Sequence, residues 1–403
     1  MKVLFLTMDR FVDINDKGIY TDLMRRFCKD SHEVYIVSPV ERREGKPTYL
    51  NENEGIHLLR VKTLNLQKTN IFEKGIGQVL LEYSFRSAIS KYFGEVKFDL
   101  VLYSTPPISF SKVIKWVKNR TGAMSYLMLK DIFPQNAVDL GMLSKSGIKG
   151  LLYQYFRNKE RELYNISDYI GCMSPANVQY VLSHNTDVDK RKTEICPNSL
   201  ELIEDEPPSI NNGINIREKY NLPSNLPLFI YGGNLGKPQG IPFLIKCLDA
   251  NKDRTDCHFI VVGSGSEYYK IEEWVSQKSP HSVSLFKGLP IDDYEQLVCA
   301  CNVGLIFLDY RFTIPNYPSR LLSYMRAKKP IIVCSDKNSD MGLIAEENKY
   351  GFYCESNDVN GFTLLVDKIL NEDMVQMGIN GYNYFMNNYT VDNSFNAIIK
   401  HLK

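Results

Sequence analysis

The sequence lacks several features that would assign it to a familiar class. No apolar run approaches the roughly 20 residues of a membrane-spanning helix, so we expect any membrane contact to be peripheral. There is no Cys-x-x-Cys and no Cys/His pair at zinc-ligand spacing, which excludes the common structural zinc sites. No Gly-x-Gly-x-x-Gly follows the first apolar run, so a dinucleotide site is not expected there. The absence of solenoid repeats and strongly biased segments leaves a folded, globular protein.

Cysteine and net charge are informative through their distribution. The nine cysteines are scattered, and many lie in apolar surroundings such as Ile331–Cys334, which predicts reduced, buried thiols in a cytoplasmic protein. The net charge is only +1, yet residues 1–198 carry 29 Lys and Arg against 22 Asp and Glu, whereas residues 199–403 carry 19 against 25. The basic first half suggests contact with something anionic, unless the split reflects only two solvated surfaces.

Length and periodicity predict two α/β domains. A chain of 403 residues is too long for one ordinary core. Short apolar runs alternate with segments of helical periodicity, which indicates parallel sheets with crossover helices. The predicted strands are 2–7, 32–38, 100–103, 125–129 and 169–172, then 228–231, 258–262, 282–286, 303–307 and 331–334. The predicted helices are 22–30, 78–93, 109–120 and 148–164, then 241–251, 267–277, 294–299, 321–327 and 362–370.

The domain boundary is marked by an acidic segment with two prolines, Glu201–Pro208, and we place the linker at residues 197–214. We therefore predict one Rossmann-like domain at 1–197 and a second at 198–379. The last residues, 380–403, have helical periodicity and are predicted to return to the first domain.

The strongest local signal is Phe229–Gly240, where a predicted strand runs into four glycines and then into a helix. Glycines let the backbone approach an anion, a helix N-terminus favours negative charge, and Lys237 adds a positive charge. The segment predicts a diphosphate cradle, although a glycine-rich turn shaped by packing alone is the alternative. The residues expected to contact the ligand are Gly233, Asn234, Leu235, Lys237 and Gln239.

Three further loops follow strands at the same predicted sheet edge, where ligands bind in open α/β sheets. Each alone fits an ordinary turn or helix cap, but together they indicate a phosphorylated ligand. Ser319 and Arg320 open a helix, and this pair of residue types suits phosphate. The other residues predicted to bind the ligand are Gly263, Gly265, Leu289, Tyr317 and Ser323.

In the first half, Lys130 and Asp131 follow the predicted strand 125–129 and place a charged pair at its carboxyl end. Such a pair is a candidate catalytic site, with helix capping as the alternative for Asp131. Residues 16–20, which include Gly18 and Tyr20, form a predicted flexible loop before a helix.

These motifs resemble the retaining glycosyltransferases of family 4 over nearly the whole chain, and most of all the branch that makes O-antigen and capsular polysaccharide. The first-half motifs are Ser104–Pro107, Lys130–Pro134 and Asp139–Met142. Cys196–Ser199 resembles the family's interdomain hinge, and Gly233–Gly240 and Tyr317–Pro330 resemble its donor-site motifs.

The resemblance implies the GT-B fold, with two Rossmann-like domains whose parallel sheets face an interdomain cleft. It implies a nucleotide-sugar donor, with UDP as the expected nucleotide, in the second domain. A lipid-diphosphate-linked or saccharide acceptor is expected near Gly18 and Tyr20 in the first domain. The implied reaction transfers a hexose or N-acetylhexosamine with retention, and the protein mainly stabilises the departing diphosphate. Neither a metal nor a cofactor beyond the nucleotide sugar is expected.

The chain departs from the family pattern at three places. Asn234 and Gln239 stand where members usually carry Arg and Lys, so Lys237 and Arg320 are expected to supply the charge. Pro315 and Ser323 replace the usual pair of Glu, and Lys130 lies about where a catalytic His is frequent. Two alternatives remain open at this point: a nucleotide-sugar epimerase of the same fold, and a catalytically silent GT-B subunit that binds a partner.

Two basic, helix-like segments rich in large apolar residues, Lys62–Phe93 and Ser144–Tyr164, suggest peripheral contact with an anionic membrane. Packing of both segments on the sheet is the alternative. We therefore expect a cytoplasmic protein that meets the inner face of the cell membrane, and we do not expect nucleic acid as a partner.

Overall fold

The computed structural model describes residues 1–66, 71–202 and 216–402. The chain forms two compact units, one comprising Met1–Glu201 with Thr390–Lys403 and the other Leu202–Tyr389. Most of the predicted linker, residues 203–214, lies outside the described residues. The last residues return to the first unit as predicted, but they do so at Thr390 and not at residue 380, because helix α14 (Met374–Asn388) runs unbroken through that position within the second unit. Of residues 380–403, only Thr390–Lys403 belong to the first unit.

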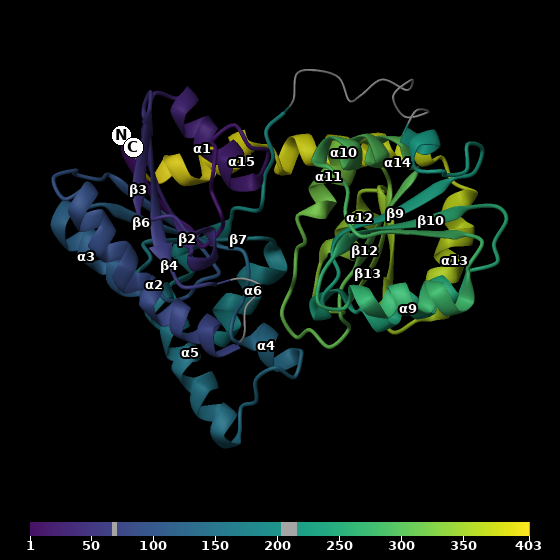
Figure 1. Cartoon of the computed structure of the whole chain (residues 1–403), viewed down its shortest axis with the longest axis horizontal. Coiled ribbons are helices and arrows are strands. Elements are labelled where there is room, and N and C mark those ends of the chain that lie inside the picture. Colours follow the sequence, from purple (N-terminus) through teal and green to yellow (C-terminus); the bar gives the residue numbers. More distant parts are fainter. Residues whose placement is uncertain (67–70, 203–215, 403) are drawn as a thin grey trace. The chain divides into compact units, whose positions relative to one another are not determined.

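The first unit is built on an eight-stranded sheet of order β3-β4-β2-β1-β5-β6-β7-β8 (Figure 1). Every pairing is parallel except that of β3 with β4. Its central strands read as continuous apolar runs because helices cover both faces. The strands are β1 (Lys2–Leu6), β2 (Glu33–Glu41), β3 (Tyr49–Asn53), β4 (Ile56–Thr63), β5 (Leu100–Ser104), β6 (Met124–Leu129), β7 (Tyr169–Cys172) and β8 (Thr193–Ile195).

Helices α1 and α15 cover one face of this sheet, where Phe27 and Phe395 meet with ring centroids 4.9 Å apart. On the other face, the hydroxyl of Tyr103 in β5 lies 2.6 Å from that of Ser167, directly after α5. The helices are α1 (Ile19–Lys29), α2 (Ile71–Tyr92), α3 (Ser111–Thr121), α4 (Gln135–Asp139), α5 (Gly147–Ile166), α6 (Pro175–His184) and α15 (Val391–Ile399). The short 3-10 turns are Arg42–Glu44, Lys190–Lys192 and Lys400–Leu402.

The expected helical segment at Lys62–Phe93 is wrong at its start. Lys62 lies in β4, which pairs with β2 from Val34↔Ile56 to Glu41↔Thr63, so the ladder fixes these residues as a strand. Residues 67–70 lie outside the described residues, and α2 begins at Ile71. The segment therefore does not form one continuous basic helix.

The second unit contains a six-stranded, fully parallel sheet of order β11-β10-β9-β12-β13-β14. The strands are β9 (Leu228–Asn234), β10 (His258–Ser264), β11 (Val283–Phe286), β12 (Val303–Phe307), β13 (Ile331–Ser335) and β14 (Gly351–Glu355). The helices are α8 (Ile241–Ala250), α9 (Tyr268–Lys278), α10 (Ile291–Ala300), α11 (Arg320–Arg326), α12 (Met341–Glu347), α13 (Val359–Leu370) and α14, with a 3-10 turn at Lys237–Gln239. Strand order reverses between β9 and β12, and such a switch point is where open α/β sheets bind ligands.

Candidate functional site

The carboxyl end of β9 separates from β12 at the switch point. β9 pairs with β12 only at Phe229 and Ile230, whereas it stays paired with β10 as far as Asn234. Tyr324 of α11 fills the position that β12 leaves. Its hydroxyl accepts from the Gly232 N–H and donates to the Ile230 carbonyl, each at 3.1 Å. The backbone groups of β9 are thus satisfied while the end of the strand is held apart from its neighbour.

Glycines allow the carboxyl ends of β9 and β10, and the residues directly after them, to approach each other. A Cβ atom at Gly263 would lie 1.9 Å from the Gly233 carbonyl oxygen, and one at Gly265 would lie 2.4 Å from that of Leu235. Gly233 has a φ of 121°, in the region that favours glycine, and it is exposed. Gly263 and Gly265 are predicted to bind the ligand. In the structure, their lack of side chains makes room for the backbone at Gly233 and Leu235.

The predicted ligand residues of the β9 loop divide into two groups: those that hold the shape of the loop and those that are exposed on it. The Gln239 Oε1 atom accepts from the Asn234 side-chain amide at 2.9 Å and from the Gly236 N–H at 3.2 Å. Leu235 is fully buried, and its N–H donates to the Ser264 carbonyl at 3.0 Å. Leu235 and Gln239 thus hold the shape of the loop, whereas Gly233, Asn234 and Lys237 are exposed on it.

Arg320 places a positive charge at this carboxyl edge of the second sheet. Its guanidinium lies over the Tyr231 ring, 4.4 Å from the centroid, and a Cβ atom at Gly233 would lie 3.3 Å from its Nη2 atom. The Nη1 atom is buried without a hydrogen-bond partner, and no carboxylate of the described residues forms an ion pair with Arg320. A half-buried arginine that has no counter-ion and keeps one buried nitrogen without a partner, beside an exposed glycine, is suited to an anionic ligand.

The remaining predicted ligand residues are less clearly grouped. Tyr317 is buried, and its hydroxyl has no hydrogen-bond partner. Ser319 is exposed directly before α11, and Ser323 is half-buried one turn along it. Leu289 is half-buried after β11, two strands from β9 in the sheet, so the structure does not bring it to the switch point.

Two carboxylates at this sheet edge were not predicted from the sequence. Asp309 follows β12; its N–H donates to the Pro238 carbonyl at 2.9 Å, and its carboxylate pairs with Arg311 at 2.8 Å. Asp336 follows β13 and has one oxygen, Oδ2, that is buried without a partner. Burial raises the pKa of Asp336 to about 6. The available signal was an Asp directly after each apolar strand, the same signal that singled out Asp131.

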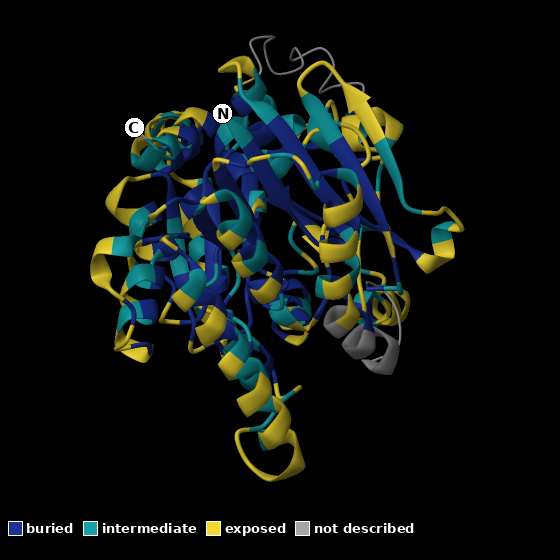
Figure 2. Cartoon of the chain, turned by 90° about the vertical axis from the view of Figure 1, so that its left-hand side faces the viewer, coloured by how far each residue is buried: buried dark blue, intermediate teal, exposed yellow. Residues whose placement is uncertain are grey.

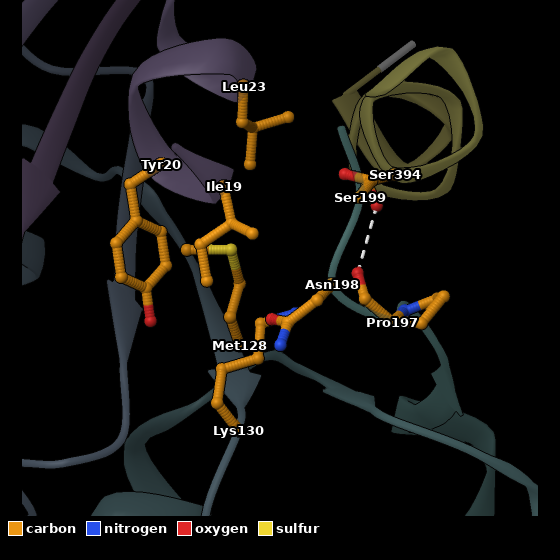
Figure 3. A pocket seen from close by; sticks show the side chains of 9 residues that line it. All are labelled: Ile19, Tyr20, Leu23, Met128, Lys130, Pro197, Asn198, Ser199 and Ser394. Atoms are coloured by element: carbon orange, nitrogen blue, oxygen red, sulfur yellow. Dashed lines mark hydrogen bonds between the residues drawn. The ribbon is translucent and has the colours of Figure 1, made fainter. Parts of the chain in front are cut away.

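In the first unit, Lys130 and Tyr20 line one small pocket (Figure 3). Lys130 follows β6 and donates from Nζ to the Cys196 carbonyl at 3.1 Å, and burial lowers the pKa of its amine. Burial and the charge of Asp9 raise the pKa of the Tyr20 hydroxyl, and Asn198 contributes a buried Oδ1 atom with no partner. The structure thus brings a predicted catalytic residue and a predicted acceptor-loop residue together.

Asp131 and Gly18 have other surroundings. Both carboxylate oxygens of Asp131 accept from the Asn136 side-chain amide at 2.8 Å, and burial raises the pKa of this carboxyl. Thr105 Oγ1 accepts from the N–H groups of Lys130 and Asp131, at 3.1 and 3.2 Å, so the two side chains diverge from one fixed backbone. Gly18 precedes α1, where its N–H donates to Asp22 at 3.2 Å.

Comparison with known proteins identifies the family that this chain resembles. Residues 213–384, which lie within the second unit, match the model of the group 1 glycosyl transferases. A probable glycosyltransferase of Pseudomonas aeruginosa, WbjE, is 22% identical over 77% of this chain and 75% of its own length. Residues 213–384 therefore resemble the group 1 glycosyl transferases, and the relatives support a glycosyltransferase. A second relative of this transferase, the putative colanic acid biosynthesis glycosyl transferase WcaI of Escherichia coli K12, is 21% identical over 62% of this chain and 60% of its own length.

The fold of the transferase is GT-B, as solved structures show over the whole chain. Sucrose-phosphate synthase of Thermosynechococcus elongatus has a TM-score of 0.76 at 14% identity, and the match covers 100% of this chain and 98% of that one. HepE of Anabaena, solved in complex with UDP, has a TM-score of 0.67 at 14% identity, with 100% and 99% covered. The match of predicted and observed architecture confirms the fold class.

Within the described residues, neither a candidate metal-binding cluster nor a candidate membrane-spanning helix is found. No group of three or more His, Cys, Asp or Glu side chains in these ranges is placed to hold a metal ion. No helix of the described part of the chain has the length and apolar character needed to cross a bilayer.

Proposed function

We propose that this transferase moves a hexose or N-acetylhexosamine from a UDP-sugar to a lipid-diphosphate-linked or saccharide acceptor in bacterial surface-polysaccharide synthesis, with retention of configuration. One observation carries the donor side: the half-buried Arg320 has no counter-ion and keeps its Nη1 atom buried without a partner, beside the exposed Gly233 at the switch point. The likeness to WcaI supports a role in polysaccharide synthesis, and the likeness to HepE, solved with UDP, supports the nucleotide.

The proposed chemistry places the diphosphate at the end of β9. Arg320 and the exposed Lys237 stabilise the negative charge that develops as the diphosphate leaves, and this effect is strong where water is excluded. Both groups are fixed before the reaction, because Tyr231 supports Arg320 and Gln239 holds the loop that carries Lys237. No divalent metal is required in this scheme.

On the acceptor side we propose that the Lys130–Tyr20 pocket receives the hydroxyl that attacks. The lowered pKa of Lys130 makes its neutral form more accessible, and a neutral amine accepts a hydrogen bond from that hydroxyl. Asp131, with a raised pKa, is the second proposed catalytic residue. We further propose that the first unit meets the acceptor at the cytoplasmic face of an anionic membrane.

The test is thermal unfolding with a panel of nucleotide diphosphates. UDP should stabilise the protein by about 2.7 kcal/mol at a hundredfold excess over its dissociation constant. The same shift should appear with EDTA present, and transfer from the matching UDP-sugar should survive EDTA. If no nucleotide diphosphate shifts the transition, the proposed donor site is wrong.

A further inference from the structure

The first half of α5 carries large apolar side chains that are exposed in the described structure. Ile148 is 89% exposed and Leu151 is 76% exposed. With Leu152 and Tyr155, also exposed, they recur at the i, i+3, i+4 and i+7 positions of one helix face. The buried residues of α5 are confined to its last two turns, at Glu160, Leu163 and Tyr164. Figure 2 shows the free end of the helix as a largely exposed projection at the bottom of the view.

The charges around this face have one sign. Residues 140–159 contain Lys145, Lys149, Arg157 and Lys159 and no Asp or Glu. Arg157 and Lys159 are engaged within the unit, with Glu160 at 2.5 Å and Glu162 at 2.7 Å. Lys145 and Lys149 are exposed, and neither forms an ion pair with a described residue. The positive charge available to a partner therefore lies beside the exposed apolar face.

We propose that this α5 tip, meaning residues 142–155, is the surface through which the transferase docks on an anionic bilayer. An amphipathic helix with apolar residues on one face and lysines beside it lies in the interface plane, with its apolar face at the boundary of headgroups and acyl chains. The lysine stems extend along apolar surface while their ammonium groups reach lipid phosphates. The docking surface rests on the proposed function only for its purpose, which is access to a lipid-linked acceptor.

A second copy of the chain is a poorer occupant of this surface. Two copies meeting tip to tip would bring lysines together with no acidic residue between positions 140 and 159 to compensate. A stable protein interface also needs roughly 20 residues on each side, far more than this single helix face offers. A lipid surface requires neither a matching shape nor a second set of contacts.

The test is flotation of the full chain with phosphatidylcholine vesicles that contain or lack phosphatidylglycerol. We expect salt-sensitive binding to the anionic vesicles only. The double variant Lys145→Gln with Lys149→Gln should lower the partition coefficient about fivefold for each lysine. Leu151→Ser and Ile148→Ser should each lower it roughly tenfold. The matched controls, Lys246→Gln and Leu364→Ser, replace an exposed lysine and an exposed leucine of the second unit and should bind as the unchanged protein does.

Each outcome bears on one proposal only. Flotation is measured without substrate, and circular dichroism and thermal unfolding of the same variants are measured as evidence that they fold. Equal flotation of tip variants and unchanged protein, or no flotation at low salt, would overturn the docking surface while leaving the donor site intact. Loss of a concentration-dependent dimer in the Leu151→Ser variant, without vesicle binding by the unchanged protein, would assign the tip to a second copy and overturn the proposal. Absent UDP stabilisation with intact flotation would instead refute the proposed function.

Discussion

At the residue scale, the two arginines of α11 differ in whether a carboxylate pairs with them. Arg326, at the far end of α11 from Arg320, pairs with Glu295 at 3.2 Å, whereas Arg320 has no carboxylate partner among the described residues. Keeping an unpaired guanidinium out of water is costly unless a ligand completes it. Arg320 is therefore the residue whose charge we expect the ligand to use.

Arg320→Leu should weaken UDP binding by about 1.5–3 kcal/mol, because a charge-assisted contact to phosphate is lost. Uridine binding should change little. Lys237→Ala should show the same preference with a smaller effect, because an exposed charge is screened by solvent. Arg326→Leu, on the same helix, is the control and should leave UDP affinity unchanged. Titration calorimetry checks these values, and equal losses for UDP and uridine would show that Arg320 does not contact phosphate.

Asp336 provides a pH-dependent prediction. Its pKa is raised from 3.8 to about 6 in the folded protein, so the folded state holds a proton that the unfolded state releases between these values. Stability should therefore fall as the pH rises from about 4 to 6. Asp336→Asn removes this penalty and should stabilise the protein by up to roughly 3 kcal/mol at neutral pH, with no gain below about pH 4. A pH-independent difference between the two proteins in denaturant unfolding would contradict this.

At the element scale, the β9 and β10 loops fit together only because their facing positions are glycine. Gly263→Ala would place a methyl group against the Gly233 carbonyl, and one loop would have to move. We expect a loss of stability of about 1–3 kcal/mol and at least a tenfold rise in the dissociation constant of UDP. Gly381→Ala in α14, where a Cβ atom would meet only the Tyr350 side chain, is the control. Unchanged UDP affinity in Gly263→Ala would show that the loop shape does not set donor binding.

At the scale of the whole molecule, the chain completes its first unit with its last residues. Phe395 and Ile398 of α15 are buried against α1 and the first sheet, and Phe395 meets Phe27 of α1, which lies more than 350 residues earlier in the sequence. Phe395→Ala should destabilise the first unit by about 3–5 kcal/mol. UDP affinity, which belongs to the second unit, should stay unchanged. Differential scanning calorimetry with and without UDP checks this, and a variant that loses both stability and UDP binding would show that the units do not act separately.

The sequence by itself determined the fold class and the glycine-rich segments at the sheet edge, because both depend on short-range patterns. Continuous apolar runs specify buried parallel strands, and glycines after those runs mark strand-to-helix turns, as at Gly232–Gly240. The sequence did not separate the glycines that face a ligand from those that face a loop, because Gly263 meets Gly233 only through strand pairing. It also missed β3, β8 and β14, because short edge strands carry weak periodicity, and it missed the interior strand β4 as well.

Only the tertiary structure decided which polar groups have partners. Lys130 and Asp131 are neighbours in sequence, yet one reaches Cys196 and the other Asn136. Arg320 and Asp336 stand out because each keeps one buried polar atom without a partner, and the α5 tip stands out because its apolar side chains are exposed. Both features depend on how the folded chain places its segments. Sequence patterns report which side chains prefer to be buried, whereas the folded chain determines which charges and apolar surfaces are left for a ligand or a membrane.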